Sequence, residues 1–180
     1  MTTAPIQFVT AIRLRSWHEA DLDLLRQLRN DVELQARLLS TARGSDMAAI
    51  RGWLAHRTES PGRVFHIIAD PGDDTALGYL QAELEPGQQD TWHFGICLAL
   101  EHQGAGRGSA ALITLEQRLA ADFRARKLIL EVGENNHAAI RCYQRLGFTR
   151  TVQPAWQAEV CGAMRPVIGM TKTLAAGDPR

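Results

Sequence analysis

The chain has 180 residues, of which 45% are hydrophobic and 22% are charged, and this size and composition are typical of one globular domain with a single core. The 20 basic residues balance the 20 acidic ones, so the formal net charge is zero and no overall field attracts a polyanion. Nucleic acid is therefore not expected as a partner.

Cysteine spacing and hydropathy indicate a cytoplasmic protein. Cys97, Cys142 and Cys161 are widely spaced and form no CxxC pair, so we expect reduced thiols rather than disulfides or metal ligands. The N-terminus has no basic-then-apolar signal, and nowhere do about 18 apolar residues follow one another. We therefore expect no membrane partner and no bound metal.

The first part of the chain is predicted to form a strand and a broken helix. Residues 8–14 alternate loosely in hydrophobicity, as a strand does, and Ser16 with Glu19 has the spacing of a capping box. Leucines then recur with the 3.6-residue period of a helix. We expect this helix to break near residues 30–31 and to resume to about Leu39.

The next segments change from a helical to a strand-like pattern. A second helix follows Ser45 and ends before Pro61. The three strands predicted after it are joined by short turns rich in Gly, Pro and Asp, so they should be antiparallel neighbours. They cover residues 64–69, 77–85 and 91–100.

A glycine-rich loop over residues 103–108 separates the last of these strands from an amphipathic helix over residues 109–123. Such a loop favours anions, because the first N–H groups of a helix lack partners within it and point at a ligand. The loop has neither the lysine of a Walker loop nor the glycine spacing of a Rossmann fingerprint. The alternative is a simple turn whose glycines only supply positive φ.

The rest of the chain completes a mixed fold. An apolar strand over residues 127–132 follows the helix, and a crossover of that length makes the strands on either side of it parallel. A short helix after Asn136 ends at Gly147. Two more strands follow, over about residues 149–160 and 166–174, and residues 175–180 form a tail. We expect one α/β (α+β) domain over residues 1–180.

The order and spacing of these motifs resemble the core of the GNAT superfamily of N-acetyltransferases, which use acetyl-coenzyme A (acetyl-CoA). The motifs are Gln103-x-x-Gly106-x-Gly108, then an apolar-Glu-Val strand, then Asn136-x-x-Ala139-x-x-x-Tyr143-x-x-x-Gly147-Phe148. The resemblance implies a single GNAT-like domain with a cofactor core over about residues 91–150. In that fold two parallel strands splay apart, the pantetheine pairs with the first strand, and the pyrophosphate rests on the glycine loop.

The resemblance also implies the residues that contact acetyl-CoA. This chain has Ala105 and Arg107 where relatives often carry a basic and an aliphatic residue. Because phosphate is contacted mostly by backbone N–H groups, the phosphate site is still expected. The alternative for residues 96–98 is an ordinary buried strand. The implied contacts are Ile96, Cys97, Leu98, Gln103, Gly104, Ala105, Gly106, Arg107, Gly108, Ser109, Asn136 and Tyr143.

Tyr143 occupies the position of the family's general acid, where a phenol near pKa 10 is matched to a thiolate near pKa 8.5. The alternative role is an aromatic anchor for the short helix. The base is open between Glu131, which lies where acetyltransferases of protein N-termini place one, and Glu83, Glu85 or His93 on neighbouring strands. For each of these the alternative is a solvated polar group on a strand.

The acceptor implied by the resemblance is a primary amine. Residues 28–31 resemble relatives that act on ribosomal-protein N-termini and relatives that acetylate amino sugars, while a small molecule such as a polyamine or an antibiotic stays open. Trp156 is the best aromatic candidate for the acceptor side, and Trp53 is another. The alternatives to an enzyme are a catalytically silent acyl-CoA sensor and an interaction domain, and both monomer and homodimer are open.

Overall fold

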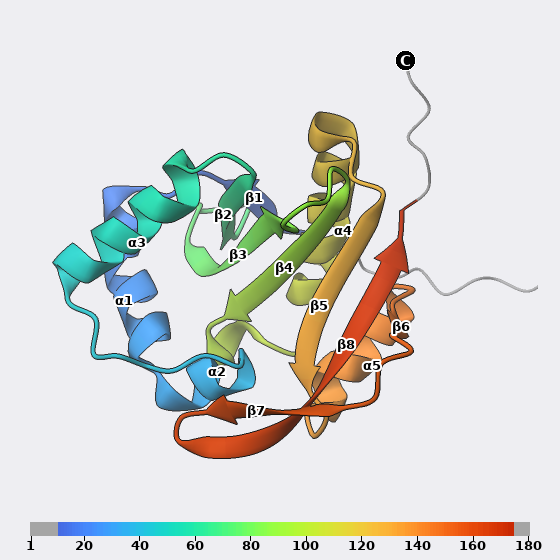
Figure 1. Ribbon diagram of the computed structural model, residues 1–180. Coiled ribbons are helices and arrows are strands. Elements are labelled where there is room, and N and C mark those ends of the chain that lie inside the picture. Colours follow the sequence, from blue (N-terminus) through green and yellow to red (C-terminus); the bar gives the residue numbers. More distant parts are fainter. Residues whose placement is uncertain (1–10, 175–180) are drawn as a thin grey trace, which may run out of the picture.

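The strand-like segments of the sequence form one mixed sheet (Figure 1). Its strands are β1 (Arg13–Arg15), β2 (Arg63–Ala69), β3 (Ala76–Leu84), β4 (Thr91–Leu98), β5 (Lys127–Gly133), β6 (Thr149–Arg150), β7 (Trp156–Val160) and β8 (Ala163–Thr173). The order is β1-β2-β3-β4-β5-β8-β6, and β7 also pairs with β8. Within the described part of the chain, only β4 and β5 pair in parallel. This computed structural model describes residues 11–174, and it confirms the predicted α/β class and mainly antiparallel sheet.

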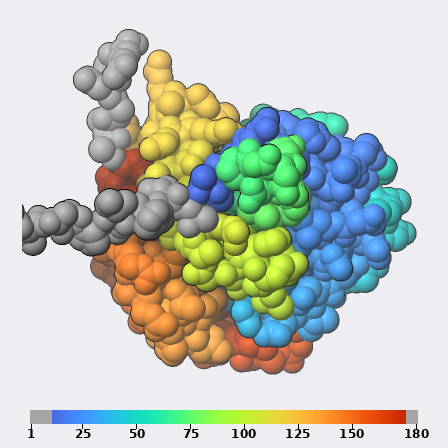
Figure 2. Space-filling model, turned by 180° about the vertical axis from the view of Figure 1, so that it is seen from behind, coloured from blue at the N-terminus to red at the C-terminus, as the bar shows by residue number. Residues whose placement is uncertain are grey.

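Helices cover both faces of the sheet. Figure 1 shows α1 and α3 on the side of β2 and β3, and α4 and α5 behind β4, β5 and β8. Figure 2, seen from behind, shows α4 in yellow and α5 in orange, with the yellow-green segment that precedes α4 exposed beside them. The helices are η1 (Glu19–Asp21), α1 (Leu22–Asn30), α2 (Val32–Arg37), α3 (Met47–Glu59), η2 (Leu100–His102), α4 (Arg107–Phe123) and α5 (His137–Arg145).

Each helical layer packs its own apolar core against the sheet. Leu112 of α4 and Ile140 of α5 belong to one core, and Leu25 of α1 and Ile50 of α3 belong to the other. Because side chains alternate across a strand, β4 contributes to both: its even-numbered residues face α4 and α5, and its odd-numbered residues face α1 and α3. Strand β4 is therefore the wall that the two cores share.

The parallel pair separates along its length, as the resemblance implied. Pairing between β4 and β5 covers only Thr91–Lys127, Trp92–Leu128 and His93–Ile129. Beyond these residues the two strands continue without pairing to each other, while β4 stays paired with β3 and β5 with β8. A gap therefore opens in the middle of the sheet toward the C-terminal ends of β4 and β5.

The predicted helix break is confirmed, and its cause is a cap. The chain leaves the helical conformation at Asp31, whose side chain accepts a hydrogen bond from the Leu34 N–H at 2.9 Å and so begins α2. The Asn30 side chain makes two hydrogen bonds to the Ser45 backbone: its amide nitrogen donates to the Ser45 carbonyl, and its amide oxygen accepts from the Ser45 N–H. These contacts fix the segment between α2 and α3 beside the end of α1.

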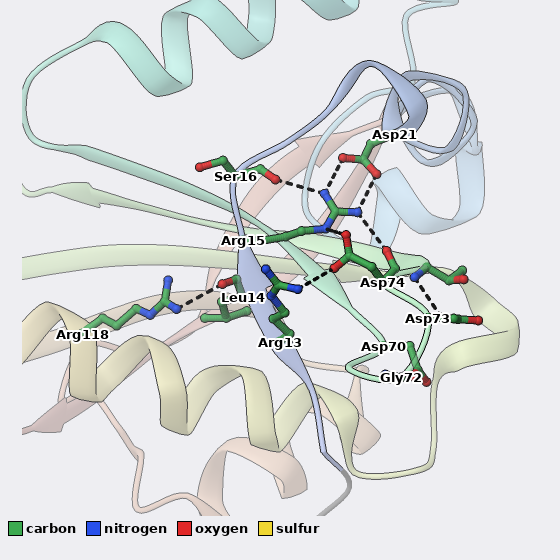
Figure 3. Close-up of polar contacts among 11 residues, drawn as sticks. Arg13, Leu14, Arg15, Ser16, Asp21, Asp70, Gly72, Asp73, Asp74 and Arg118 are labelled. Carbon is green, nitrogen blue, oxygen red and sulfur yellow. Dashed lines mark hydrogen bonds and ion pairs between the residues drawn. The ribbon is translucent and has the colours of Figure 1, made fainter.

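The predicted Ser16–Glu19 capping box is wrong. The first helical turn begins at Glu19, and the Asp21 carboxylate accepts a hydrogen bond from the His18 N–H at 2.7 Å. The Ser16 carbonyl instead accepts a hydrogen bond from Arg15. Figure 3 shows why: the Arg15 guanidinium binds Asp21 and Asp74 and holds the chain extended before the turn.

Three other predicted boundaries differ. The first strand, expected over residues 8–14, is β1, and residues 8–10 lie outside the described residues. The strand expected over residues 149–160 is two strands, β6 and β7, which both pair with β8. Helix α4 begins two residues earlier than expected, at Arg107. The tail expected over residues 175–180 also lies outside the described residues.

Candidate functional site

A cavity of about 630 Å³ occupies the gap between β4 and β5 and extends to both faces of the sheet. On the side of α4 and α5 its lining includes Ile96, Leu112, Asn136, Ala139, Cys142 and Tyr143. On the side of α1 and α3 the lining includes Arg29, Trp53, Arg57, Tyr79, Gln81, His93, Cys97 and Glu131. The cavity therefore joins two compartments through the sheet, which suits two ligands that meet in the gap.

Backbone groups of β4 face this gap. The Ala99 N–H donates to the Leu77 carbonyl at 3.0 Å, so the odd-numbered residues of β4 bond β3 and the even-numbered ones face β5. Ile96 and Leu98 thus present backbone groups to the gap, and the Leu98 carbonyl accepts a hydrogen bond from Gln103 Nε2 at 2.9 Å. Cys97 differs from the prediction for this strand, because its backbone pairs with Tyr79 and only its buried side chain reaches the cavity.

The glycine loop leads into the N-terminus of α4 at the edge of the cavity. Gly104 and Gly106 have φ angles of 82° and 78°, which L-residues with side chains rarely adopt. Gly106 is the N-cap residue, and α4 runs for 17 residues behind it, so the positive end of its dipole lies at the loop. A Cβ atom at Gly104 would meet nothing within 4 Å. The loop therefore combines open space with the first N–H groups of a helix, which lack partners within that helix, and this suits an anion.

Asn136 and Tyr143 lie on α5 and both line the cavity. The Asn136 side-chain oxygen accepts a hydrogen bond from the Ala139 N–H at 3.2 Å and caps the helix, so Asn136 has a structural role as well. The Tyr143 ring packs edge-on against Phe94 and Phe148. Burial raises the pKa of the Tyr143 hydroxyl to about 12, so this group keeps its proton throughout the neutral range.

The candidate bases lie in different places. Glu131 and His93 line the cavity, and Glu131 is exposed on the side of α1 and α3. Glu83 is absent from that lining and is bound by Arg63 at 3.0 Å and Arg57 at 2.9 Å. The hydrogen bond from Arg63 lowers the pKa of Glu83, and Arg57 lowers it further. A carboxylate with a lowered pKa is a weaker base, so position and charge both favour Glu131 over Glu83.

The sequence did not indicate the arginines that line the cavity on the side of α1 and α3. Arg29 follows Leu25 by four residues and Leu22 by seven, so it lies on the same face of α1 as these buried leucines and meets Trp53 of α3. An arginine on the apolar face of a helix is a signal that could have located it. Arg57 lies one helical turn after Trp53 on α3, and Trp53 lines the cavity as the sequence allowed. Trp156 is 37% exposed on β7 and is not part of the cavity lining.

Three findings concern other kinds of site. Within residues 11–174 no helix combines the length and apolar character needed to cross a membrane. In the same range no three side chains of His, Cys, Asp or Glu are grouped so that they could hold a metal ion. Cys97, Cys142 and Cys161 are free thiols, and Cys142 Sγ lies 3.2 Å from Ser109 Oγ at the start of α4.

The comparisons with known proteins agree with this geometry. The family description "Acetyltransferase (GNAT) domain" matches residues 11–149. The structure is similar to that of spermidine N-acetyltransferase from Vibrio cholerae in complex with CoA and spermine, with a TM-score of 0.81, 17% identity, and coverage of 90% of this chain and 95% of that one. It is also similar to a GNAT-family acetyltransferase from Bacillus anthracis, with a TM-score of 0.75, 10% identity, and coverage of 90% and 94%.

A curated relative gives a local sequence match. Spermine/spermidine N(1)-acetyltransferase of Bacillus subtilis (strain 168) is 45% identical over 47 residues, which is 26% of this chain. The match spans 31% of the length of that relative.

Proposed function

The chain belongs to the GNAT acetyltransferase family, and from this premise we propose that it moves the acetyl group of acetyl-CoA to a primary amine. The observation that carries the proposal is the cavity through the sheet, because it offers one compartment to each substrate and joins them at the gap between β4 and β5. The relatives named for spermine and spermidine support a small-molecule amine as the acceptor class.

The described residues fit acetyl-CoA on the side of α4 and α5. The backbone groups of Ile96 that face the gap suit the amides of an extended pantetheine chain, as an added strand would. The glycine loop and the first N–H groups of α4 suit the pyrophosphate. Asn136, the N-cap residue of α5, lines the same cavity. When bound there, acetyl-CoA supplies a thioester as the acetyl donor.

The chemistry requires two proton movements. Transfer forms a bond between the amine nitrogen and the acetyl carbon and breaks the carbon–sulfur bond, while the amine loses one proton and the departing thiolate gains one. Tyr143 holds a proton at Oη, because burial keeps its pKa near 12, and donates it to the thiolate. Glu131, on the opposite side of the gap, receives the amine proton.

The need for Glu131 depends on the acceptor. An α-amine near pKa 7.7 is neutral about one time in six at pH 7, whereas a lysine-like amine near pKa 10.4 is neutral about once in 2,500. The difference is roughly 3.7 kcal/mol. Glu131 should therefore matter most for strongly basic amines and least for weakly basic ones.

The first experiment measures binding and transfer separately. Calorimetric titration with acetyl-CoA should show micromolar binding, and a free-thiol assay over a panel of amines should show release with one class. Tyr143→Phe should lower kcat by about 100-fold, the usual loss of a general acid, and leave the Kd of acetyl-CoA within about 2-fold of the wild-type value.

The same experiment separates the alternatives. An equal loss of acetyl-CoA affinity in Tyr143→Phe would show that Tyr143 binds or packs rather than donates a proton. Binding without thiol release from any amine would favour a catalytically silent acyl-CoA sensor. Absence of acetyl-CoA binding would contradict the cofactor site itself.

A further inference from the structure

We propose that the amine substrate itself carries an anionic group, a carboxylate or a phosphate, which Arg29 and Arg57 bind on the acceptor side of the cavity. This inference rests on the proposed function, since it names the class of acceptor used at the same site. It sets this chain apart from relatives whose names specify polyamines, which are polycations.

The charge of the cavity is the first argument. Among the described residues that line it are four arginines, Arg29, Arg37, Arg43 and Arg57, and one carboxylate, Glu131. Arg37 pairs with Glu33, and Arg57 pairs with Glu83. Arg29 and Arg43 form no ion pair with any residue of the range 11–174. Since the chain as a whole has zero net charge, this excess of positive charge is local to the cavity.

The fixed position of Arg29 is the second argument. Its guanidinium carbon lies 4.3 Å from the centroid of the Trp53 ring, a stacking contact that holds the plane of the guanidinium. Its Nε is buried and has no hydrogen-bond partner among residues 11–174. A buried N–H of a charged group is costly to leave unpaired, so this donor is well placed for an acceptor atom of a ligand.

Arg57 adds a second donor to the same subsite. It follows Trp53 by four residues on α3, so both side chains lie on one face of that helix. One of its terminal nitrogens binds Glu83 at 2.9 Å, and its Nε is buried and unpaired within the described part of the chain. Glu83 thereby positions Arg57, and the Nε–H donor is left without a protein partner among the described residues.

A buried acceptor atom completes the pattern. The Gln81 Oε1 atom has no hydrogen-bond donor among the residues that the structure describes. Gln81 lies on β3 two residues after Tyr79, whose ring contacts Trp53 at 5.3 Å between centroids, and both line the cavity. The subsite therefore offers two cationic donors and one neutral acceptor.

An amine that also carries an acid satisfies all three groups. Its carboxylate or phosphate oxygens accept hydrogen bonds from Arg29 and Arg57, and an N–H of the same molecule donates to Gln81. A protonated polyamine has only donors, so it would leave the Nε groups of Arg29 and Arg57 unpaired and would bring positive charge beside Arg29 and Arg43, which have no ion-pair partner in the described part of the chain. The geometry thus favours amino acids, amino-acid-like amines or phosphorylated amines.

The test compares amines that differ only in the acid. The pairs are β-alanine with β-alaninamide, L-alanine with L-alaninamide, and O-phosphoethanolamine with ethanolamine, and spermidine is measured beside them. Thiol release at saturating acetyl-CoA gives kcat/KM for each. We expect kcat/KM to be at least about 10-fold higher for the acid-bearing member of at least one pair. This ratio corresponds roughly to the contribution of one hydrogen bond to a charged group. The carboxylate and phosphate pairs distinguish the two kinds of anion.

Two arginines provide a matched pair of variants. Arg57 and Arg63 both bind the Glu83 carboxylate, but Arg57 lines the cavity and Arg63 lies outside its lining. Arg57→Met should raise KM for the preferred acid-bearing amine by about 10- to 100-fold and leave its uncharged partner little changed. Arg63→Met should stay near the wild-type value for both. The Kd of acetyl-CoA should be unchanged in both variants, which also checks that they fold.

Several outcomes would overturn the inference. One is turnover of spermidine or of the uncharged partners at least as fast as the acids, and another is an equal effect of Arg57→Met and Arg63→Met. If acetyl-CoA binds but no amine in the panel is acetylated, the same acids are titrated calorimetrically into the CoA-saturated protein. If none of the acids binds, or if Arg57→Met binds them as tightly as the wild type does, the proposal is contradicted. Failure of acetyl-CoA to bind at all would instead contradict the proposed function.

Discussion

At the scale of single residues, the burial of Tyr143 determines when it can act as an acid. Packing against Phe94 and Phe148 shields part of the ring from water, and this desolvation raises the pKa of the hydroxyl to about 12. The sequence alone suggested an ordinary phenol near pKa 10, because spacing reveals a position but not its burial. The consequence is an acid that stays protonated over a wide range of pH.

The pH dependence of the reaction tests this role. An acid is lost only as pH rises through its pKa, so Tyr143 should cause no fall in kcat/KM below about pH 10. The amine must be neutral to attack, so kcat/KM should rise with pH and reach a plateau near the pKa of the amine. The measurement is kcat/KM for one amine from pH 6 to 10. A fall with a midpoint near pH 8 or 9 that Tyr143→Phe abolishes would show that its pKa is not raised.

At the scale of elements, the proposed cofactor site requires the start of α4 to leave space for a ligand as well as to begin a helix. Gly108 lies in the first turn, and a Cβ atom there would contact Leu98 Cδ1 at 3.6 Å and Ile96 Cδ1 at 3.9 Å. These are ordinary contact distances, so an alanine fits the protein. It would, however, occupy space beside the residues that face the gap. The sequence located the turn before this helix correctly, because several glycines between a strand and an amphipathic pattern predict a turn.

Gly108→Ala should therefore separate affinity from stability. Replacing a helical glycine with alanine stabilises a helix by up to about 1 kcal/mol, whereas a methyl group forced into a packed site costs about 1 kcal/mol or more. We expect an unchanged or slightly raised Tm and acetyl-CoA binding weakened by about 5-fold or more. Gly52→Ala in α3 is the control, since a Cβ there meets nothing within 4 Å. Equal acetyl-CoA affinity in the two variants would argue against a cofactor contact at Gly108.

The limits of sequence reasoning are also clear at this scale. The break at Asp31 was predictable because a capping side chain acts on its own next turn. The start of η1 was not, because it depends on Arg15, whose partners Asp21 and Asp74 lie far apart in the chain. Arg57 was missed for the same reason, because its partner Glu83 lies on another element. A charged turn looks the same in sequence whether it meets solvent or another element, whereas the place of Arg29 on the leucine face of α1 was a signal that could have found it.

At the scale of the whole molecule, two cores lie on opposite faces of one sheet, and the cavity lies where the sheet opens between them. The β7–β8 hairpin reaches beneath the sheet toward α2 (Figure 1), where Cys161 Sγ lies 3.5 Å from the Ser40 carbonyl oxygen. The turn residues Cys161 and Gly162 were predictable, but the contact with Ser40 was not, because it joins segments about two thirds of the chain apart. Ser40 lines the cavity, so this part of the cavity wall depends on long-range packing.

The buried ion pair between Arg15 and Asp21 allows the contribution of one such pair to the stability of the whole fold to be measured. Two hydrogen bonds of 2.7 and 2.9 Å join them, and their side chains are 7% and 4% exposed. The pair joins β1 to the start of the helical layer over the second core (Figure 3). Burial by itself would raise the pKa of Asp21, but hydrogen bonds from Arg15 and from the His18 backbone lower it below the usual value.

Asp21→Asn should lower the free energy of unfolding at pH 7 by about 3 kcal/mol, because it leaves the buried guanidinium with only the more exposed Asp74 as a counter-charge. Since the folded-state pKa is lowered, the contribution of Asp21 is complete above its unfolded pKa of about 3.9 and is lost as pH falls through the lower folded value. The gap between wild type and variant, measured by urea unfolding, should therefore narrow below about pH 4. Asp74→Asn is the control: its partner is also Arg15, but its side chain is 39% exposed, so we expect a loss of about 1 kcal/mol or less. Similar losses in the two variants would show that burial does not strengthen the dependence of the fold on this pair.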